Sequence, residues 1–168
     1  MTASHGTVEQ LENAIEVNPS FILPVLRESR PIFNGDLLEK YRNARPSKKS
    51  LEKFIETTES SLAITQRLLE LQSELPSIIY PLILRLRAVY LTEALLDGKE
   101  HSTMGFMELL FKAGFSRKQA SELIAVFRCV RGSKPAPKTT LSHQDMIRLF
   151  DVVEDSYQRV GGKWEKLA

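Results

Sequence analysis

Residues 47–74, SKKSLEKFIETTESSLAITQRLLELQSE, form the clearest amphipathic pattern of the chain. Apolar side chains recur there three and four positions apart, which is the spacing of one face of an α-helix. The repeated positions are Leu51, Phe54, Ile55, Leu62, Leu68 and Leu69, with Thr58 and Thr65 on the same face. We therefore predict one long helix, spanning roughly 40 Å at the rise of an α-helix.

The next stretch, residues 78–96, is the most apolar of the chain. Pro76 separates it from the preceding helix, and Pro81 fits a helix only within its first turn. Arg85 and Arg87 near its middle argue against a membrane span, because each would cost roughly 2.5–3.5 kcal/mol at the bilayer centre. A central helix packed on several sides explains the same run. Since the connection is short, we predict a long antiparallel hairpin at the centre of the fold.

Helix signals continue on both sides of this hairpin. Hydroxyl side chains at Thr7, Ser102, Ser116 and Ser142 precede apolar runs of helical period, and such side chains accept hydrogen bonds from the free N–H groups of a first turn. Strand signals are lacking, because apolar residues do not alternate with polar ones. The sequence predicts an all-α fold, a bundle of about seven helices.

Prolines and glycines divide the chain into three regions. Residues 1–46 contain Pro19, Pro24 and Pro31 between short apolar runs, which predicts short helices and a proline-rich segment folded over the others. Residues 47–160 are expected to supply the bundle core. The pair Gly161-Gly162 predicts the end of the last helix, so residues 161–168 are expected to be a flexible tail.

Composition is that of a globular protein. Of 168 residues, 42% are hydrophobic and 26% are charged, which excludes a wholly disordered chain and is enough for one domain. Cys129 is the single cysteine, so no internal disulfide can form, and residues 1–6 lack the apolar core of a signal peptide. We expect a cytoplasmic protein without a membrane partner.

Sequence motifs for catalysis or metal binding are absent. The chain has neither a phosphate-binding GxxxxGK[ST] loop nor a GxSxG nucleophile turn. His5, His101, His143 and Cys129 include no pair at the spacing of metal ligands. We therefore expect no metal, no cofactor and no catalysis, and an enzyme whose residues converge from several helices is the alternative.

One window of the sequence is strongly basic. Between positions 112 and 138, seven basic residues accompany a single acid, Glu122, so the window has a net charge of +6 and the rest of the chain −4. Such a window is typical of a surface for the phosphates of RNA or DNA, although a solvated face without a partner produces the same pattern. The candidate binding residues are Lys112, Arg117, Lys118, Gln119, Arg128, Arg131, Lys134 and Lys138.

The same window has the outline of a helix-turn-helix. A short helix precedes the turn Ala113-Gly114-Phe115, and Ser116 caps a second helix. In that motif the first residues of the second helix contact base edges in the major groove, so Arg117, Lys118 and Gln119 would be the readers. A helix-turn-helix DNA-binding regulator is therefore the alternative function, although any helical hairpin with a glycine turn reproduces the pattern.

Two segments resemble a known family. One runs from FILP at 21–24 through PIFNGDLLEKY at 31–41, and the other is FRCVRG at 127–132, followed by a final helix. They resemble the helical C-terminal part of archaeal predicted nucleotidyltransferases, whose helices are similar to the HEPN class of often dimeric helical modules. The strand-borne Gly-Ser and DxD or DxE signature of the transferases is absent, and no Arg lies four to six residues before a His. The resemblance therefore implies an accessory portion without either active site.

The principal hypothesis combines these observations. We expect a non-catalytic, HEPN-like accessory or interaction module that binds RNA, a nucleotide or a partner protein through the basic window. Exposed apolar surface on residues 47–96 is expected to form a homodimer, because a long antiparallel hairpin offers enough area for a twofold contact.

Overall fold

The computed structural model describes residues 7–30, 35–42 and 44–165, and these residues form eight helices without a strand. This confirms the all-α prediction. The extra helix is the second one, in a segment where only short pieces were expected. In chain order the helices are α1 (Val8–Val17), α2 (Pro19–Glu28), α3 (Gly35–Arg42), α4 (Lys48–Glu70), α5 (Leu75–Asp97), α6 (Thr103–Lys112), α7 (Arg117–Arg131) and α8 (His143–Glu165).

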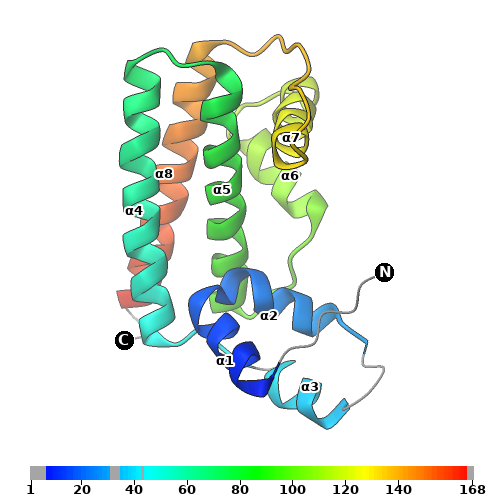
Figure 1. Ribbon diagram of the computed structural model, residues 1–168. Helices are drawn as coiled ribbons and strands as arrows, with labels where there is room; N and C mark the ends of the chain where they lie inside the picture. Colours follow the sequence, from blue (N-terminus) through cyan, green and yellow to red (C-terminus); the bar gives the residue numbers. More distant parts are fainter. Residues whose placement is uncertain (1–6, 31–34, 43, 166–168) are drawn as a thin grey trace.

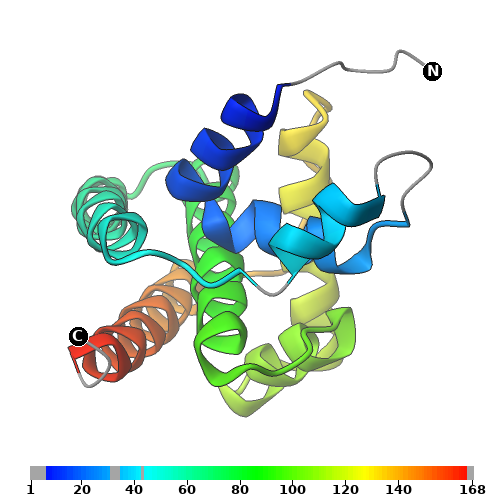
Figure 2. The ribbon, with the colours of Figure 1, turned by 90° about the horizontal axis from the view of Figure 1, so that it is seen from below.

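Helix α5 is the centre of the bundle. It contacts α8 most extensively, followed by α7, α4 and α2 (Figure 1). Seen from below, α5 lies between α4 and α8 on one side and α6 and α7 on the other (Figure 2). Its side chains Ile79, Ile83, Leu86 and Val89 are fully buried. The prediction that residues 78–96 form a helix packed on several sides is therefore confirmed. Residues 71–74 connect α4 to α5.

Four helix starts were predicted correctly from their capping residues. The hydroxyl groups of Thr7, Ser102, Ser116 and Ser142 each accept a hydrogen bond from the backbone N–H three residues later. These bonds satisfy donors that a helix leaves free in its first turn. Among the described residues, no helix has the length and apolar character that crossing a membrane requires.

Helix α5 starts earlier than the sequence indicated. It begins at Leu75 with Pro76 in its first turn, so Pro81 lies inside the helix and not in the first turn. A proline inside a helix costs about 3 kcal/mol, whereas burial of one large aliphatic side chain stabilises by about 1.5–3 kcal/mol. Ile78, Ile79 and Leu82 are buried on either side of Pro81, and their burial outweighs that cost.

The predicted end of the last helix is wrong. Helix α8 continues through Gly161 and Gly162 to Glu165, although a glycine costs about 1 kcal/mol in a helix interior relative to alanine. Val160 is buried, and the ammonium of Lys163 lies 2.9 Å from a carboxylate oxygen of Glu93 on α5. These contacts hold the helix beyond the glycines. Of the expected tail, residues 166–168 lie outside the described residues.

The N-terminal helices lie across the lower end of the bundle (Figure 1). Leu23 of α2 is fully buried, and Ser20 forms a buried 2.5 Å hydrogen bond with Thr92 of α5. Residues 19–28 therefore fold over the bundle, as the proline-rich pattern predicted, with Pro24 inside α2. Pro31 and the other residues of 31–34 lie outside the described residues, as do residues 1–6.

Candidate anion-binding cleft

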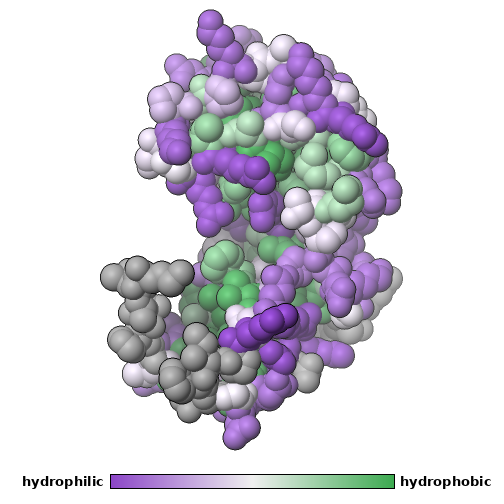
Figure 3. All heavy atoms as spheres, turned by 90° about the vertical axis from the view of Figure 1, so that its right-hand side faces the viewer, coloured by the Kyte–Doolittle hydropathy of each residue, from purple (hydrophilic) through white to green (hydrophobic). Residues whose placement is uncertain are grey.

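A cleft of about 810 Å³ lies between α5, α6 and α7, and the last residue of α2 contributes to its rim. Figure 3 views this side of the molecule, which is hollowed between the upper helices and the N-terminal part. Hydrophilic side chains surround more hydrophobic ones there. The residues of the cleft that carry charge are Arg87, Arg128 and Glu28, with His101 beside them.

Arg87 reaches the cleft from the central helix. Its guanidinium carbon lies 5.8 Å from the ring centroid of Phe106 on α6 and 5.8 Å from that of Phe127 on α7. Both rings are almost completely buried. A guanidinium within about 6 Å of an aromatic face is attracted by the ring's quadrupole, by roughly 0.5–1 kcal/mol at an exposed site. The two rings therefore hold Arg87 in a defined position.

Two further arginines from α7 act on Arg87. Partial burial lowers the pKa of the Arg87 guanidinium, and the positive charges of Arg131 and Arg128 lower it further. In the described part of the chain, none of the three arginines forms an ion pair with a carboxylate. The three like charges repel one another, and an anion bound between them would relieve that repulsion.

Three arginines of α7 lie on one face of the helix, with Ser121 between them. Arg117, Ser121, Arg128 and Arg131 are separated by four, seven and three residues, which keeps them within one stripe at 3.6 residues per turn. Arg117 and Arg131 are both exposed and stand about 21 Å apart along the helix axis. The stripe extends from the cleft towards the beginning of α7.

The other basic residues predicted from the sequence lie around this stripe. Lys118 is exposed and has its ammonium 3.9 Å from a carboxylate oxygen of Glu122, on a neighbouring face. Hydrogen bonds from Thr139 and then Thr140 lower the pKa of Glu122 and tie the loop after α7 to the helix. The same loop carries the exposed Lys134 and Lys138.

Of the eight predicted binding residues, only Arg128 lines the cleft, and Arg131 lies near enough to act on Arg87. Lys112 lines a separate cleft of about 540 Å³ between α5, α6 and α8, together with Glu93, Glu108 and Asp155. The side chain of Gln119 is hydrogen-bonded within the fold. Its side-chain oxygen accepts from the Ser116 N–H at 3.0 Å, and its amide nitrogen donates to Asp145 Oδ1 at 3.0 Å.

Sequence reasoning missed Arg87, His101 and Tyr90 as parts of the cleft. The imidazole Nε2 of His101 lies 3.2 Å from a carboxylate oxygen of Glu28. The Tyr90 hydroxyl donates to the carbonyl oxygen of Ser102 and accepts from its N–H, both at 3.3 Å, which fixes the start of α6. The one available signal was a charged residue, Arg87, in the most apolar helix.

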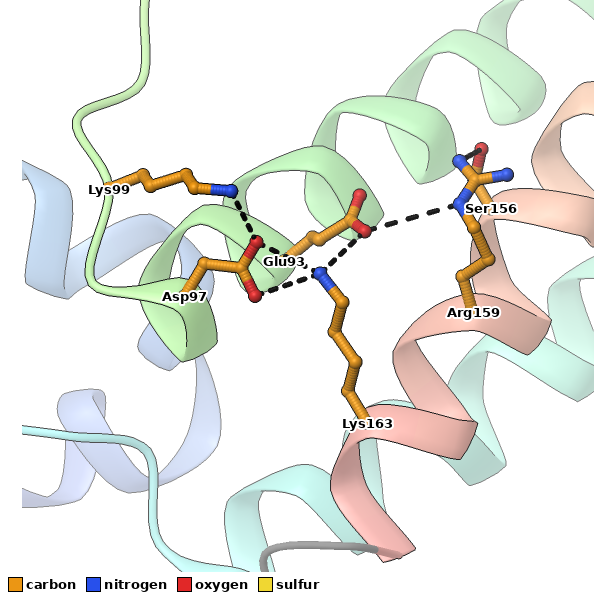
Figure 4. Close-up of polar contacts among 6 residues, drawn as sticks. All are labelled: Glu93, Asp97, Lys99, Ser156, Arg159 and Lys163. Carbon is orange, nitrogen blue, oxygen red and sulfur yellow. Dashed lines mark hydrogen bonds and ion pairs between the residues drawn. The ribbon is translucent and has the colours of Figure 1, made fainter.

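A second polar cluster joins α5 to α8 (Figure 4). The Lys163 ammonium lies 2.8 Å from Asp97 Oδ1 and 2.9 Å from Glu93 Oε1. Hydrogen bonds from Lys163 and then Lys99 lower the pKa of Asp97, and although partial burial opposes it, the carboxylates raise the pKa of Lys163. Arg159 adds a weaker contact to Glu93 at 4.0 Å. Every charge here has an opposite partner, so this cluster stabilises the fold.

No family model, curated protein or solved structure matches this chain. The cleft is therefore interpreted from its own chemistry. Within the described residues, no group of three or more histidine, cysteine, aspartate or glutamate side chains is arranged to hold a metal ion. What distinguishes the cleft is positive charge without a partner.

Proposed function

We propose that this chain is a non-catalytic, HEPN-like accessory module of the cytoplasm that binds single-stranded RNA in the cleft between α5 and α7. One observation carries the proposal: Arg87 and Arg128 line the cleft from two helices, Arg131 lies close enough to lower the pKa of Arg87, and none of the three forms an ion pair in the described part of the chain. Buried charges are normally paired in proteins, so the partly buried Arg87 without an ion pair favours an external anion.

Phosphate is the anion that fits this cluster best. A guanidinium presents its donors in a planar fork that matches two phosphate oxygens, and its charge persists at any physiological pH. The arginine stripe continues along α7 to Arg117, which suits a ligand with several phosphates in a row. Because the cations approach from two sides of a cleft, a flexible single strand fits better than a rigid duplex.

The helix-turn-helix alternative has less support. Of its three readers, Gln119 is bound on both sides of its amide, and Lys118 has Glu122 as a neighbour. Only Arg117 is left exposed without such a contact within the described residues. One arginine at the start of α7 is too little for reading a DNA sequence, which commonly takes three or four side chains.

The proposal includes a homodimer through the α4–α5 hairpin, with the two helices antiparallel. Exposed apolar side chains support it: Ile64 on α4 is 65% exposed, Leu71 after α4 is 62% exposed and Leu84 on α5 is 46% exposed. A twofold contact would bury these on both subunits. Light scattering on a size-exclusion column is expected to give twice the chain mass, and the mass of one chain at every concentration contradicts the dimer.

RNA binding is tested by fluorescence anisotropy with a labelled single-stranded RNA. Arg87→Gln and Arg128→Gln are each expected to weaken binding about tenfold, which corresponds to about 1.4 kcal/mol, within the usual range for a hydrogen bond to a charged group. Arg67→Gln on α4 removes the same charge far from the cleft, since Arg67 is exposed and paired with Glu70. That control variant is expected to bind like the wild type.

Two results would overturn the proposal. If Arg67→Gln weakens binding as much as Arg128→Gln, the protein attracts RNA only by its overall charge. If neither cleft variant changes the affinity, the RNA binds elsewhere. Circular dichroism of each variant shows that a lost affinity does not come from a lost fold.

A further inference from the structure

The cleft has one wall of positive charge and one carboxylate on its rim. Arg87 and Arg128 line it from α5 and α7, whereas Glu28 at the end of α2 has a side chain that is 70% exposed. The Glu28 carboxylate lies 3.2 Å from His101 Nε2, which keeps it at the rim. Any ligand that enters between the arginines therefore meets a negative charge towards α2.

We infer that the cleft receives a terminal phosphate of the RNA, a phosphomonoester, in preference to an internal phosphodiester. This inference rests on the proposed RNA binding and adds which part of the strand occupies the cleft. The terminal phosphate comes from either the 5′ or the 3′ end, because both carry the same group.

Charge is the first argument for a terminal phosphate. A phosphomonoester carries about 1.5 to 2 negative charges at neutral pH, with a second pKa near 6, whereas a phosphodiester carries about one. The cleft supplies Arg87 and Arg128, and Arg131 lies close enough to lower the pKa of Arg87. A terminal dianion brings about two negative charges to Arg87 and Arg128, the two cations that line the cleft, whereas one internal phosphate at the same place brings about one.

The path of the strand is the second argument. An internal phosphate needs a polyanion to enter the cleft on one side and to leave on the other. In one direction the strand can follow Arg117 along α7, and in the other it meets Glu28. A carboxylate next to a phosphate is repulsive, so Glu28 lowers the affinity for a strand that continues in its direction. A chain end needs only the direction along α7.

Size is the third argument. Sites for small molecules and cofactors enclose about 300–1,000 Å³, and the cleft falls within that range at about 810 Å³. One terminal nucleotide is a ligand of this class. Beyond the cleft, the stripe that leads to Arg117 would contact only the sugar-phosphate backbone of the following nucleotides.

The inference is tested with three single-stranded RNAs of one sequence, each labelled at an internal base. One has a 5′ phosphate, one has a 3′ phosphate and one has hydroxyl groups at both ends. Anisotropy titrations are expected to show at least tenfold tighter binding for one phosphorylated RNA than for the hydroxyl RNA. Arg128→Gln is expected to reduce this preference to less than threefold, and because Arg128 is exposed, its replacement leaves the core intact.

A second variant tests the role of the rim. Glu28→Gln is expected to improve binding of the hydroxyl RNA more than that of the phosphorylated RNA, because an internal phosphodiester no longer meets a carboxylate. Glu52→Gln on α4, also exposed, removes the same charge outside the cleft and is expected to leave both affinities unchanged.

The possible results separate the two claims. Equal affinity for all three RNAs, together with weaker binding by Arg128→Gln, overturns the terminal-phosphate inference and leaves RNA binding in place. No measurable binding of any RNA overturns the proposed function. An unchanged preference in Arg128→Gln also overturns the inference, because the terminal phosphate would then lie outside this cleft.

Discussion

Salt dependence of RNA binding follows quantitatively from the arginine cluster. Each charge that a protein neutralises on a single strand releases about 0.7 of a counterion, so the logarithm of the association constant falls by that amount per logarithmic unit of salt. For a strand short enough to reach only Arg87, Arg128 and Arg131, the predicted slope is about −2. Raising the salt from about 50 to about 200 mM is then expected to weaken binding about twentyfold.

Removing one arginine changes the slope and not only the affinity. Arg128→Gln is expected to give a slope of about −1.4, so that the same increase in salt weakens binding about sevenfold. Arg67→Gln, which alters the net charge equally on α4, is expected to keep the wild-type slope. Anisotropy titrations in a series of potassium chloride concentrations measure all three slopes.

Equal salt slopes for the wild type and Arg128→Gln would refute this reasoning. It would mean that Arg128 releases no counterion, and therefore that the RNA phosphates do not reach the cleft. A wild-type slope near zero would refute phosphate recognition by the cluster as a whole.

Three further predictions concern the fold. Gln119→Ala removes a capping contact and the hydrogen bond that its amide donates to Asp145 on α8, so urea denaturation is expected to show a loss of about 1–2 kcal/mol with unchanged RNA affinity. Gly105→Ala is expected to lower the melting temperature, although alanine favours a helix by about 1 kcal/mol, because the added methyl group meets the Tyr90 hydroxyl. Because the pKa of Asp97 is lowered, its ionised carboxylate stabilises the protein at pH values above 3.8, the ordinary pKa of the group. This stabilisation is lost as the pH falls from there through the lowered pKa. Lys163→Met removes the main cause of the shift and is therefore expected to make the loss of thermal stability in acid less steep.

The helices were predictable because their signals are local. A hydroxyl group and the N–H three residues later are close in any chain that starts a helix, so the caps at Ser102 and Ser116 needed no knowledge of the rest. The end of α8 was not predictable in this way. Lys163 is held by Glu93 and Asp97, which are far away in sequence, and these contacts outweigh the weak helix propensity of the glycines.

The binding site was predictable only in part, because it is assembled from two helices. The basic window contains Arg128 and Arg131, but nothing local to Arg87 reveals that α7 packs beside it. Gln119 presents a different case, since the capping box with Ser116 and the role of base reader both require its side chain. The helix-turn-helix pattern predicted the role of base reader, whereas the structure has the side chain in the cap and in a hydrogen bond to Asp145 of α8.

The most direct test of the account is an NMR titration that observes the arginine Nε–Hε groups while single-stranded RNA is added. If the arginine cluster binds the RNA, the signals of Arg87, Arg128 and Arg131 move together and saturate at one affinity, while those of Arg67 and Arg159 stay in place. Shifts confined to Arg67 or Arg159, or an unchanged Arg87 at saturating RNA, would contradict it.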